Sequence, residues 1–386
     1  MKKQNIDRRH FIKISSLASG GLVIGFTLPG FQAVAAPTFD CEFFQPNAYL
    51  KIDKQGKVTV FVGKQESGQG VDTALPMIVA EELDVDFRDV KSEIAPYGTL
   101  KEGEHDTGGS QSVMTVYTQL RNAGAVAKAM LITAAANVWK IKESSCAADN
   151  GEVVNTITNK RIKYGELVCQ AALLPIPATV TLKNPKDFKL IGKSEKRSGL
   201  KDILTGKTKY GIDLKIEGML YAVSERCPVL DGTLVSVDDA AAKKVPGVVK
   251  VVSYTGTGAP MHVRAGVAVV ATNIWAAIKA RNLLDITWDE GKKNKESTEA
   301  LFKTFETKAT GKPQIEIFKK GDVSKYSKNE ISATYAEPFL AHATMEPVNF
   351  IASVKGDTCE LWGGLQLPDW AVNSIAGIGG FKKRKH

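Results

Sequence analysis

Two glycine-containing loops hold residue types that could bind an anion. Gly68 to Gly70 (Gly-Gln-Gly) lies between an expected strand and an expected helix, and Gly108 to Ser112 (Gly-Gly-Ser-Gln-Ser) precedes a long alanine-rich stretch. Glycine lets the backbone approach a ligand closely, and the free amides of a helix start attract negative charge. A serine there can cap the helix or donate its hydroxyl to a phosphate. Each loop alone could equally be a plain turn and cap, but together they could hold one ligand that has several anionic groups.

A third candidate lies in the run from Ala336 to Pro347. We predict a strand here, on which His342 and Glu346 face the same side with Thr344 between them. A carboxylate beside an imidazole suits hydrogen bonding to a polar heterocycle or an aldehyde. A buried, hydrogen-bonded pair without a chemical role fits the spacing equally well.

Regular elements must position these loops, and the apolar pattern predicts where they lie. Alternating residues at 49–53 and 57–62 predict a hairpin whose second strand runs into the first glycine loop. Helical patterns follow the two loops, at 72–83 and at about 113–141. Residues 155–200 are polar and interrupted by prolines, so we expect a connector on the surface.

A second compact unit begins near Thr205. It has predicted helices at 238–244 and 275–283 and predicted strands at 219–226, 248–253, 266–271 and 284–288. Strands mixed with short helices indicate an α+β unit of about 90 residues. A lysine-rich linker at 291–329 and a strand-rich segment at 331–365 follow.

The net charge of +9 does not indicate a nucleic-acid binder. Residues 1–35 and the run Lys382 to Lys385 each contribute +4, which leaves +1 for the rest of the chain. A nucleic-acid-binding surface needs its basic residues clustered on the folded domain.

Cysteine and histidine spacing gives no metal motif. The five cysteines (Cys41, Cys146, Cys169, Cys227 and Cys359) include no C-x-x-C pair, so any iron–sulfur centre must lie on another chain. We expect most of them to be small buried apolar groups. No two of the five histidines have metal-ligand spacing, and His105, between Glu104 and Asp106, is predicted to be a solvated loop residue.

The first 35 residues form an expected twin-arginine export signal. Arg8 and Arg9 precede Phe-Ile-Lys, an uncharged stretch runs from Ile14 to Phe39, and Ala33 to Ala35 form an A-x-A site. Cleavage near Ala35 and retention as a membrane anchor are the two alternatives. Because this route carries folded proteins, the signal favours a periplasmic protein that is loaded with a cofactor before export.

The motifs together resemble the molybdopterin-binding large subunits of the xanthine dehydrogenase and aldehyde oxidase family, isoquinoline 1-oxidoreductase beta-subunit type. The two glycine loops, the entry Thr205 to Asp213, Pro246 to Val248, the Ala-His-Ala-Thr-Met-Glu-Pro run and Gln366 to Trp370 carry the resemblance. It covers about Phe44 to Trp370. The implied fold is α+β, with molybdopterin-binding segments at 44–190 and 330–386 on either side of an a/b hammerhead domain at 205–292.

The resemblance implies a molybdenum hydroxylase-type oxidoreductase subunit with molybdopterin cytosine dinucleotide. Its substrate would be an aldehyde or an N-heteroaromatic ring with water as oxygen source, and its partners a small two-iron–two-sulfur (2Fe-2S) subunit and the twin-arginine translocase. Glu346 would orient substrate and Gln366 would lie near the molybdenum. The implied cofactor-binding residues are Gly68, Gln69, Gly70, Gly108, Gly109, Ser110, Gln111 and Ser112.

The sequence departs from this family in two catalytic parts. The family's Gly-Gly-Gly-Phe-Gly loop at the metal and its C-terminal Gly-Glu pair, which holds the general base, do not follow Trp370. We therefore expect a truncated product that is inactive alone, and the terminal Lys-Lys-Arg-Lys-His could arise from a frameshift in an adenine run. A non-enzymatic pterin-binding or assembly module and an unrelated exported structural protein remain the alternatives.

Overall fold

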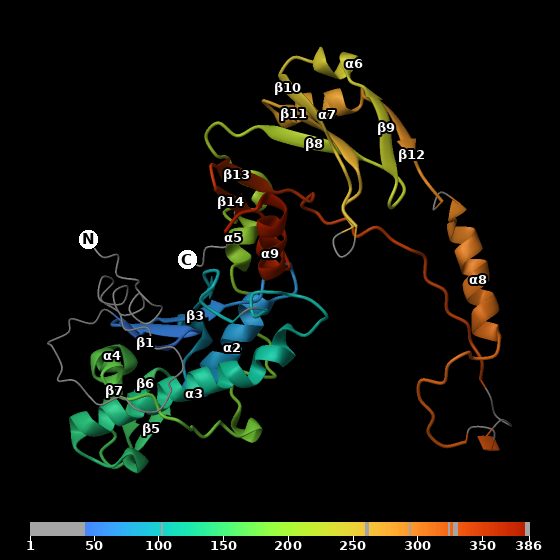
Figure 1. The fold of residues 1–386 in the computed structure, drawn as a ribbon. Coiled ribbons are helices and arrows are strands. Elements are labelled where there is room, and N and C mark those ends of the chain that lie inside the picture. The colour runs from blue at the N-terminus through green and yellow to red at the C-terminus, as the bar shows by residue number, and fades with distance from the viewer. Residues whose placement is uncertain are drawn as a thin grey trace, which may run out of the picture. The chain divides into compact units, whose positions relative to one another are not determined.

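The computed structural model describes residues 43–101, 103–258, 262–292, 295–322, 325–326 and 331–382 (Figure 1). They form two compact units, one made of the described residues up to 213 and from 344 on, the other of residues 214–343. The expected export signal, Cys41 and the last four residues of the basic tail lie outside the described residues.

A four-stranded sheet organises the first unit. Its order is β1-β2-β3-β4. The strands are β1 (Phe43–Asn47), β2 (Leu50–Asp53), β3 (Val58–Val62) and β4 (Val90–Ile94). The predicted hairpin is confirmed because β2 and β3 pair antiparallel, whereas β3 and β4 are parallel. Parallel neighbours need a crossover, which α2 (Val71–Leu83) supplies, so the first glycine loop lies where this crossover leaves the sheet.

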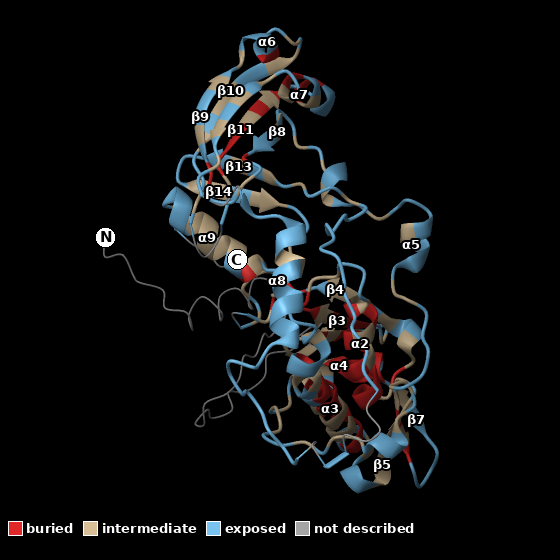
Figure 2. Ribbon diagram, turned by 90° about the vertical axis from the view of Figure 1, so that its right-hand side faces the viewer, coloured by how far each residue is buried: buried red, intermediate tan, exposed pale blue. Residues whose placement is uncertain are grey.

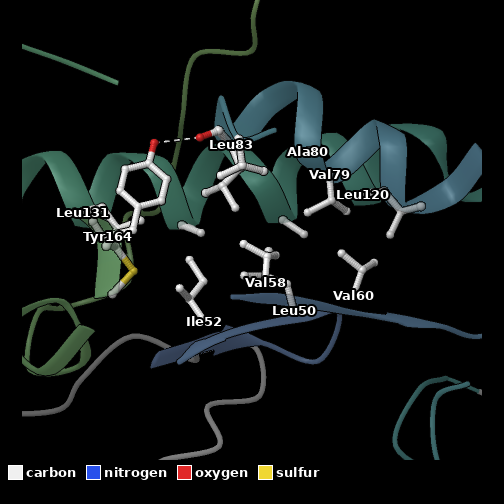
Figure 3. Packing of buried hydrophobic residues seen from close by; sticks show 14 of the residues in the cluster. Leu50, Ile52, Val58, Val60, Val79, Ala80, Leu83, Leu120, Leu131 and Tyr164 are labelled. Atoms are coloured by element: carbon white, nitrogen blue, oxygen red, sulfur yellow. Dashed lines mark hydrogen bonds between the residues drawn. The ribbon is translucent and has the colours of Figure 1, made fainter. Parts of the chain in front are cut away.

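Helix α3 (Ser112–Trp139) packs along α2 at close range. A Cβ on Gly124 of α3 would lie 2.6 Å from the carbonyl oxygen of Val79 in α2, so only glycine fits there. Figure 3 shows the two helices above the sheet, with aliphatic side chains between them and the hydroxyl of Tyr164 donating to the carbonyl oxygen of Leu83 at 2.7 Å. Burying a side chain of this kind contributes about 1.5–3 kcal/mol, so this layer fixes where both helices begin.

The remainder of the first unit consists of smaller elements. Strands β5 (Cys146–Asp149), β6 (Glu152–Asn155) and β7 (Arg161–Lys163) form a sheet in that order, followed by α4 (Tyr164–Ala172) and α5 (Leu200–Leu204). The C-terminal part adds the hairpin of β13 (Ile351–Lys355) and β14 (Thr358–Trp362), and then α9 (Pro368–Gly379).

The prediction that residues 155–200 are only a surface connector is wrong for the first part of that range. β7 and α4 lie there, and α4 buries Tyr164, Leu167, Val168 and Ala171 in the core. These positions follow the three- and four-residue spacing of a helix face, a signal that the polar flanking residues obscured. Only the stretch after α4 runs as a connector.

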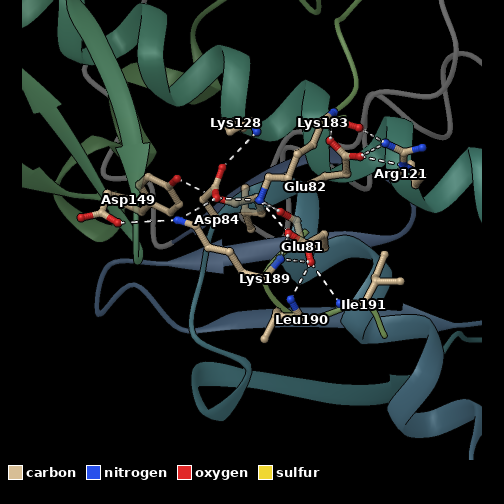
Figure 4. A network of polar contacts seen from close by, with 12 residues as sticks. Glu81, Glu82, Asp84, Arg121, Lys128, Asp149, Lys183, Lys189, Leu190 and Ile191 are labelled. Carbon is tan, nitrogen blue, oxygen red and sulfur yellow. Dashed lines mark hydrogen bonds and ion pairs between the residues drawn. The ribbon is translucent and has the colours of Figure 1, made fainter. Parts of the chain in front are cut away.

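Buried carboxylates hold this connector against α2 (Figure 4). The carboxylate of Glu81, whose side chain is fully buried, accepts the amides of residues 189–191 at 2.7–3.1 Å and the ammonium of Lys183 at 2.7 Å. Glu82 pairs with Arg121 of α3 at 2.6 Å and accepts the amide of Lys183 at 2.9 Å. Each buried charge is thus compensated by several donors, as burial requires.

The second unit contains two antiparallel sheets and short helices. The sheets have the orders β10-β11-β8 and β12-β9. Their strands are β8 (Tyr221–Arg226), β9 (Thr233–Asp238), β10 (Val248–Tyr254), β11 (Gly266–Ala271) and β12 (Asp285–Asp289). Helices α6 (Ala240–Lys243) and α7 (Ile274–Arg281) lie close to their predicted positions, whereas the mostly exposed β9 was missed. In Figure 2 the buried residues of this unit gather mainly on β11 and α7.

The predicted strand that carries His342 and Glu346 is wrong. The described residues of 331–350 have no strand conformation, and His342 is exposed. Helix α8 (Thr298–Thr310) precedes this stretch and has no buried residue, although Phe302 and Phe305 contact the Phe339 ring at 6.1 and 6.5 Å between centroids. The alternating apolar pattern had no neighbouring strand to pair with.

Two features bear on the protein's environment. No helix among the described residues is long and apolar enough to cross a membrane. Cys169 takes part in a disulfide bond, while Cys146 and Cys359 are half-buried free thiols and Cys227 is a buried one. The expectation that most cysteines are small buried apolar groups is therefore wrong for the described residues.

We predict that Glu81→Gln lowers the free energy of unfolding by about 3 kcal/mol at neutral pH. The amide group of glutamine cannot accept from Lys183 and the backbone amides as the carboxylate does. Urea denaturation followed by circular dichroism measures this change. Asp187→Asn removes an exposed carboxylate of the same connector and, as the matched control, should change stability by less than about 0.5 kcal/mol.

The same variant has a predicted pH dependence. Burial raises the pKa of Glu81, but the hydrogen bonds from Lys183 and the amides of residues 189–191 outweigh it and lower the pKa to about 2. The stabilisation is therefore complete above the ordinary pKa of 4.5 and is lost as the pH falls toward 2. The difference between wild type and Glu81→Gln should shrink from about pH 5 to pH 3, and a constant difference would contradict this assignment.

Candidate functional site

The loop that follows β3 places a buried cation beneath the site. The side chain of Lys64 leaves the sheet directly after Val62 and Gly63, and the residue is only 7% exposed. Its ammonium donates to the carbonyl oxygens of Asp106 at 2.7 Å and Gly103 at 3.3 Å. Burial lowers the pKa of Lys64, and the carboxylates of Asp106, Glu104 and Asp369 offset part of this effect.

The first glycine loop turns into α2 around a carboxylate of its own. Glu66 accepts the amides of Gly68 at 2.7 Å, Gly70 at 3.1 Å and Asp72 at 3.1 Å. Gly70, the N-cap, has a φ of 84°, which favours glycine. Burial raises the pKa of Glu66, but these amides outweigh it and lower the pKa. Burial and the neighbouring Glu66 raise the pKa of Asp72 to about 6.

The second glycine loop leads into an uncapped helix start. Gly109 and Ser110 have left-handed φ values of 62° and 56°, and α3 begins at Ser112. The N-cap Gln111 makes no side-chain capping bond among the described residues, and the first turn contains no acidic residue. The first amides of a helix lack intrahelical partners, and the helix dipole gives them a partial positive charge. This 28-residue helix therefore presents its start to an anion.

A third segment from the C-terminal part of the chain closes the site. The amide of Thr107 donates to the carbonyl oxygen of Gln366 at 2.6 Å. Asp369, only 5% exposed, accepts the amide of Gly103 at 2.8 Å and donates its own amide to the carboxylate of Asp106 at 3.1 Å. Residues about 260 positions apart in the sequence are thus joined within one unit.

These segments enclose a pocket of about 310 Å³, which we call the α3 pocket. Its lining residues are Lys64, Gly103, Glu104, Asp106, Gly108, Gln111, Ser112, Thr115, Val116, Gln119 and Leu367. The volume is at the lower end of the usual range for small-molecule sites. Donors at the start of α3 and acceptors at Glu104 and Gln119 give the pocket two chemically different sides.

The acceptor side has a defined arrangement. The carboxylate of Glu104 accepts from the Tyr49 hydroxyl at 3.1 Å and from the side-chain amide nitrogen of Gln119 at 3.3 Å. Burial and Glu104 raise the pKa of Tyr49, which keeps this hydroxyl a donor. The amide oxygen of Gln119 is shielded from solvent and has no partner among the described residues. Turning the amide over would place its oxygen against the Glu104 carboxylate, so the free group is an acceptor.

The structure brings together some of the predicted site residues and separates others. Gly108, Gln111 and Ser112 line the α3 pocket, Gly109 and Ser110 belong to the same exposed loop, and Gln366 is bonded at its edge. Gln69 folds back within its loop: its side chain accepts from the Ser67 amide at 2.7 Å and donates to the Gln65 carbonyl at 2.9 Å.

Two predicted residues lie elsewhere or differ from expectation. Glu346 is not in the lining of the α3 pocket; its carboxylate accepts from the amide of Ile212 at 3.0 Å and the side chain of Asn349 at 2.8 Å. The prediction that His105 is a solvated loop residue is wrong. It is 2% exposed and packs against Tyr97 with ring centroids 5.5 Å apart.

Sequence reasoning missed Lys64, Glu104 and Gln119. A lysine directly after a buried strand was a weak signal, because lysine is rarely fully buried without partners. Ser112, Thr115 and Gln119 have the three- and four-residue spacing of one helix face, which makes a polar stripe on a largely apolar helix. Glu104 gave no such signal.

Comparison with known proteins agrees with this geometry. A family model described as molybdopterin cofactor-binding domain matches residues 16–204. The chain is 27% identical over 436 residues to the beta subunit of isoquinoline 1-oxidoreductase from Brevundimonas diminuta, an alignment that covers 98% of this chain and 54% of that protein.

Two further relatives extend the comparison. One is the membrane-bound aldehyde dehydrogenase [pyrroloquinoline-quinone] of Gluconacetobacter polyoxogenes, 29% identical over 97% of this chain and 50% of that protein. The other is a subunit of nicotinate dehydrogenase from Pseudomonas putida, 27% identical over 83% of this chain and 27% of that protein. The chain thus spans about half the length of the first two relatives and less of the third.

The α+β fold and the matched domain define a molybdopterin-binding chain. It belongs with the molybdopterin-binding subunits of the xanthine dehydrogenase and aldehyde oxidase family, and it is similar in type to the beta subunit of isoquinoline 1-oxidoreductase.

Proposed function

We propose that this chain is the cofactor-holding portion of a molybdenum hydroxylase-type oxidoreductase and that the α3 pocket holds part of a molybdenum–pterin cofactor. One observation carries the proposal. An uncapped helix start and an unpartnered, shielded acceptor, Gln119, line the same pocket, and three segments distant in sequence close around it. The residues therefore fit a ligand that has both an anionic group and N–H donors, as a pterin phosphate has.

Each residue of the pocket has a defined part in this proposal. The first amides of α3 and the Ser112 hydroxyl would hold a phosphate. Gln119 and Glu104 would accept N–H groups of the pterin, while Lys64 keeps the 103–106 turn in place from below. When bound, the cofactor supplies a two-electron redox centre that oxidises an aldehyde or hydroxylates a carbon beside a ring nitrogen, with water as the oxygen source.

Finer points of the function are part of the same proposal. We take the cofactor to be the cytosine dinucleotide form, as the resemblance implies. Aldehydes and N-heterocycles are the proposed substrates because the names of the relatives refer to isoquinoline, nicotinate and aldehyde. Electrons would leave through a separate 2Fe-2S subunit, since the sequence has no C-x-x-C pair to hold such a cluster.

We also propose export to the periplasm by the twin-arginine translocase, with the signal either cleaved near Ala35 or kept as an anchor. The paired arginines Arg8 and Arg9 support the route. The disulfide bond of Cys169 supports the compartment, because disulfides persist in oxidising environments.

The cofactor site is tested with Gln119→Leu, which removes the free acceptor and keeps much of the side-chain volume. We expect about a tenfold loss of molybdenum and pterin per chain, the effect of one buried hydrogen bond. Elemental analysis and the fluorescence of oxidised pterin measure the two contents after expression in a host that makes the cofactor. Gln170→Leu, the same change at an exposed position of α4, is the control.

Folded Gln119→Leu protein with wild-type molybdenum and pterin would show that the α3 pocket is not the cofactor site. Turnover of an aldehyde or N-heterocycle by loaded wild-type protein, assayed with its redox partner, supports the enzyme. Stoichiometric cofactor without any turnover favours a pterin-binding or assembly module instead.

The export proposal predicts that Arg8→Lys together with Arg9→Lys abolishes accumulation in the periplasm. The paired arginines, rather than positive charge alone, are the feature that marks this route. Cell fractionation and immunoblotting measure the distribution, and Lys2→Arg together with Lys3→Arg is the charge-matched control. Periplasmic protein at the wild-type level in the Arg8/Arg9 variant would refute the route.

A further inference from the structure

The start of α2 has the form of an anion cradle, but the chain itself occupies it. Three backbone amides and one guanidinium converge there on a single carboxylate, that of Glu66. The amides are those of Gly68, Gly70 and Asp72, and the Arg197 guanidinium reaches the same carboxylate at 3.2 Å. We propose that Glu66 is a positioning residue that fills the α2 cradle and so directs the anionic group of a ligand to the start of α3.

The first step of this inference is the geometry of the cradle. Both oxygens of Glu66 are used: one accepts from Gly68, Gly70 and Arg197, and the other from Asp72. The side chain is only 17% exposed. Gly68 and Gly70, with φ values of 108° and 84°, allow the backbone to wrap around the carboxylate. A phosphate could use these amides only by displacing Glu66.

The second step is the competition that such a displacement involves. Glu66 is attached two residues from the first of the amides it binds, so its effective concentration at the cradle exceeds that of any free ligand. An incoming phosphate would also approach a carboxylate of the same sign. The α2 cradle is therefore closed to a free anion, although its donors suit one.

The third step is the contrast between the two helix starts in the same unit. α2 begins with Glu66 bound to its amides and with Asp72 in its first turn, whereas α3 begins without a side-chain cap or an acidic residue. The Gln69 amide is not among the groups bound to Glu66. The two glycine loops, alike in sequence signal, are thus unlike in what they offer.

A fourth observation concerns Arg197, which reaches the cradle from the connector. Its Nε atom is shielded and has no partner among the described residues, while its terminal nitrogen pairs with Glu66. Removal of the carboxylate would leave this guanidinium and three amides facing a vacated position. Glu66→Ala should therefore create an anion site where the wild type has none.

The test is a titration of the full chain with inorganic phosphate, followed by the amide NMR signals of the two helix starts. In the wild type we expect saturable shifts at Ser112, Val113 and Met114 and none at Gly68, Gly70 and Asp72. In Glu66→Ala the second group should shift saturably as well. Glu195→Ala, an exposed glutamate in the same connector as Arg197, should behave as the wild type.

The outcomes separate this inference from the proposed function, on which its second half rests. Saturable shifts at Gly68, Gly70 and Asp72 in the wild type, or none there in Glu66→Ala, would overturn the role of Glu66. Absent shifts at residues 112–114 would instead count against the anion site at α3. If Glu66→Ala fails to fold, Glu66→Gln keeps the side-chain length and should show a weaker gain of the same response.

Discussion

The α3 pocket depends on the junction between residues 103–107 and residues 366–369. Three hydrogen bonds make it, from Gly103 to Asp369, from Asp369 to Asp106 and from Thr107 to Gln366. Bonds to a charged group contribute about 1.5–3 kcal/mol, against about 0.5–1.5 kcal/mol for neutral ones. The buried Asp369 carboxylate is therefore the strongest single link, and without it the turn that carries Glu104 would have no support from this side.

Charge compensation explains how this junction can be buried. The Lys64 ammonium lies beneath the same turn, bound to two carbonyl oxygens, with three carboxylates close enough to oppose the effect of burial on its pKa. Glu81 solves the opposite problem in the same way, with an ammonium and three amides around one carboxylate. Glu66 is a third case. In all three, a charge that would be costly alone fixes a loop that has little apolar surface.

The sequence predicted the parts of this site that lie next to periodic elements. Both glycine loops were located because a hairpin strand and two amphipathic helices border them, and the α+β class followed from the same patterns. Lys64, Glu104 and Gln119 could not be found in this way, since their burial depends on residues 366–369, which are far away in sequence. The strand expected around His342 and Glu346 failed for a related reason: alternation indicates a strand only where a neighbouring strand supplies hydrogen bonds. The difference between the two glycine loops was also hidden, because only the fold shows that Glu66 turns back onto its own helix.

Amide hydrogen exchange tests the junction most directly. In Asp369→Ala the amide of Gly103 loses its acceptor, so its exchange should become about tenfold faster or more, and that of Thr107 should follow as the 366–369 segment loosens. Amides in the centre of α3 should keep their wild-type rates, as should every site in the control Asp357→Ala, which alters an exposed turn. Unchanged protection of Gly103 and Thr107 in Asp369→Ala would contradict the claim that the C-terminal segment holds the pocket together.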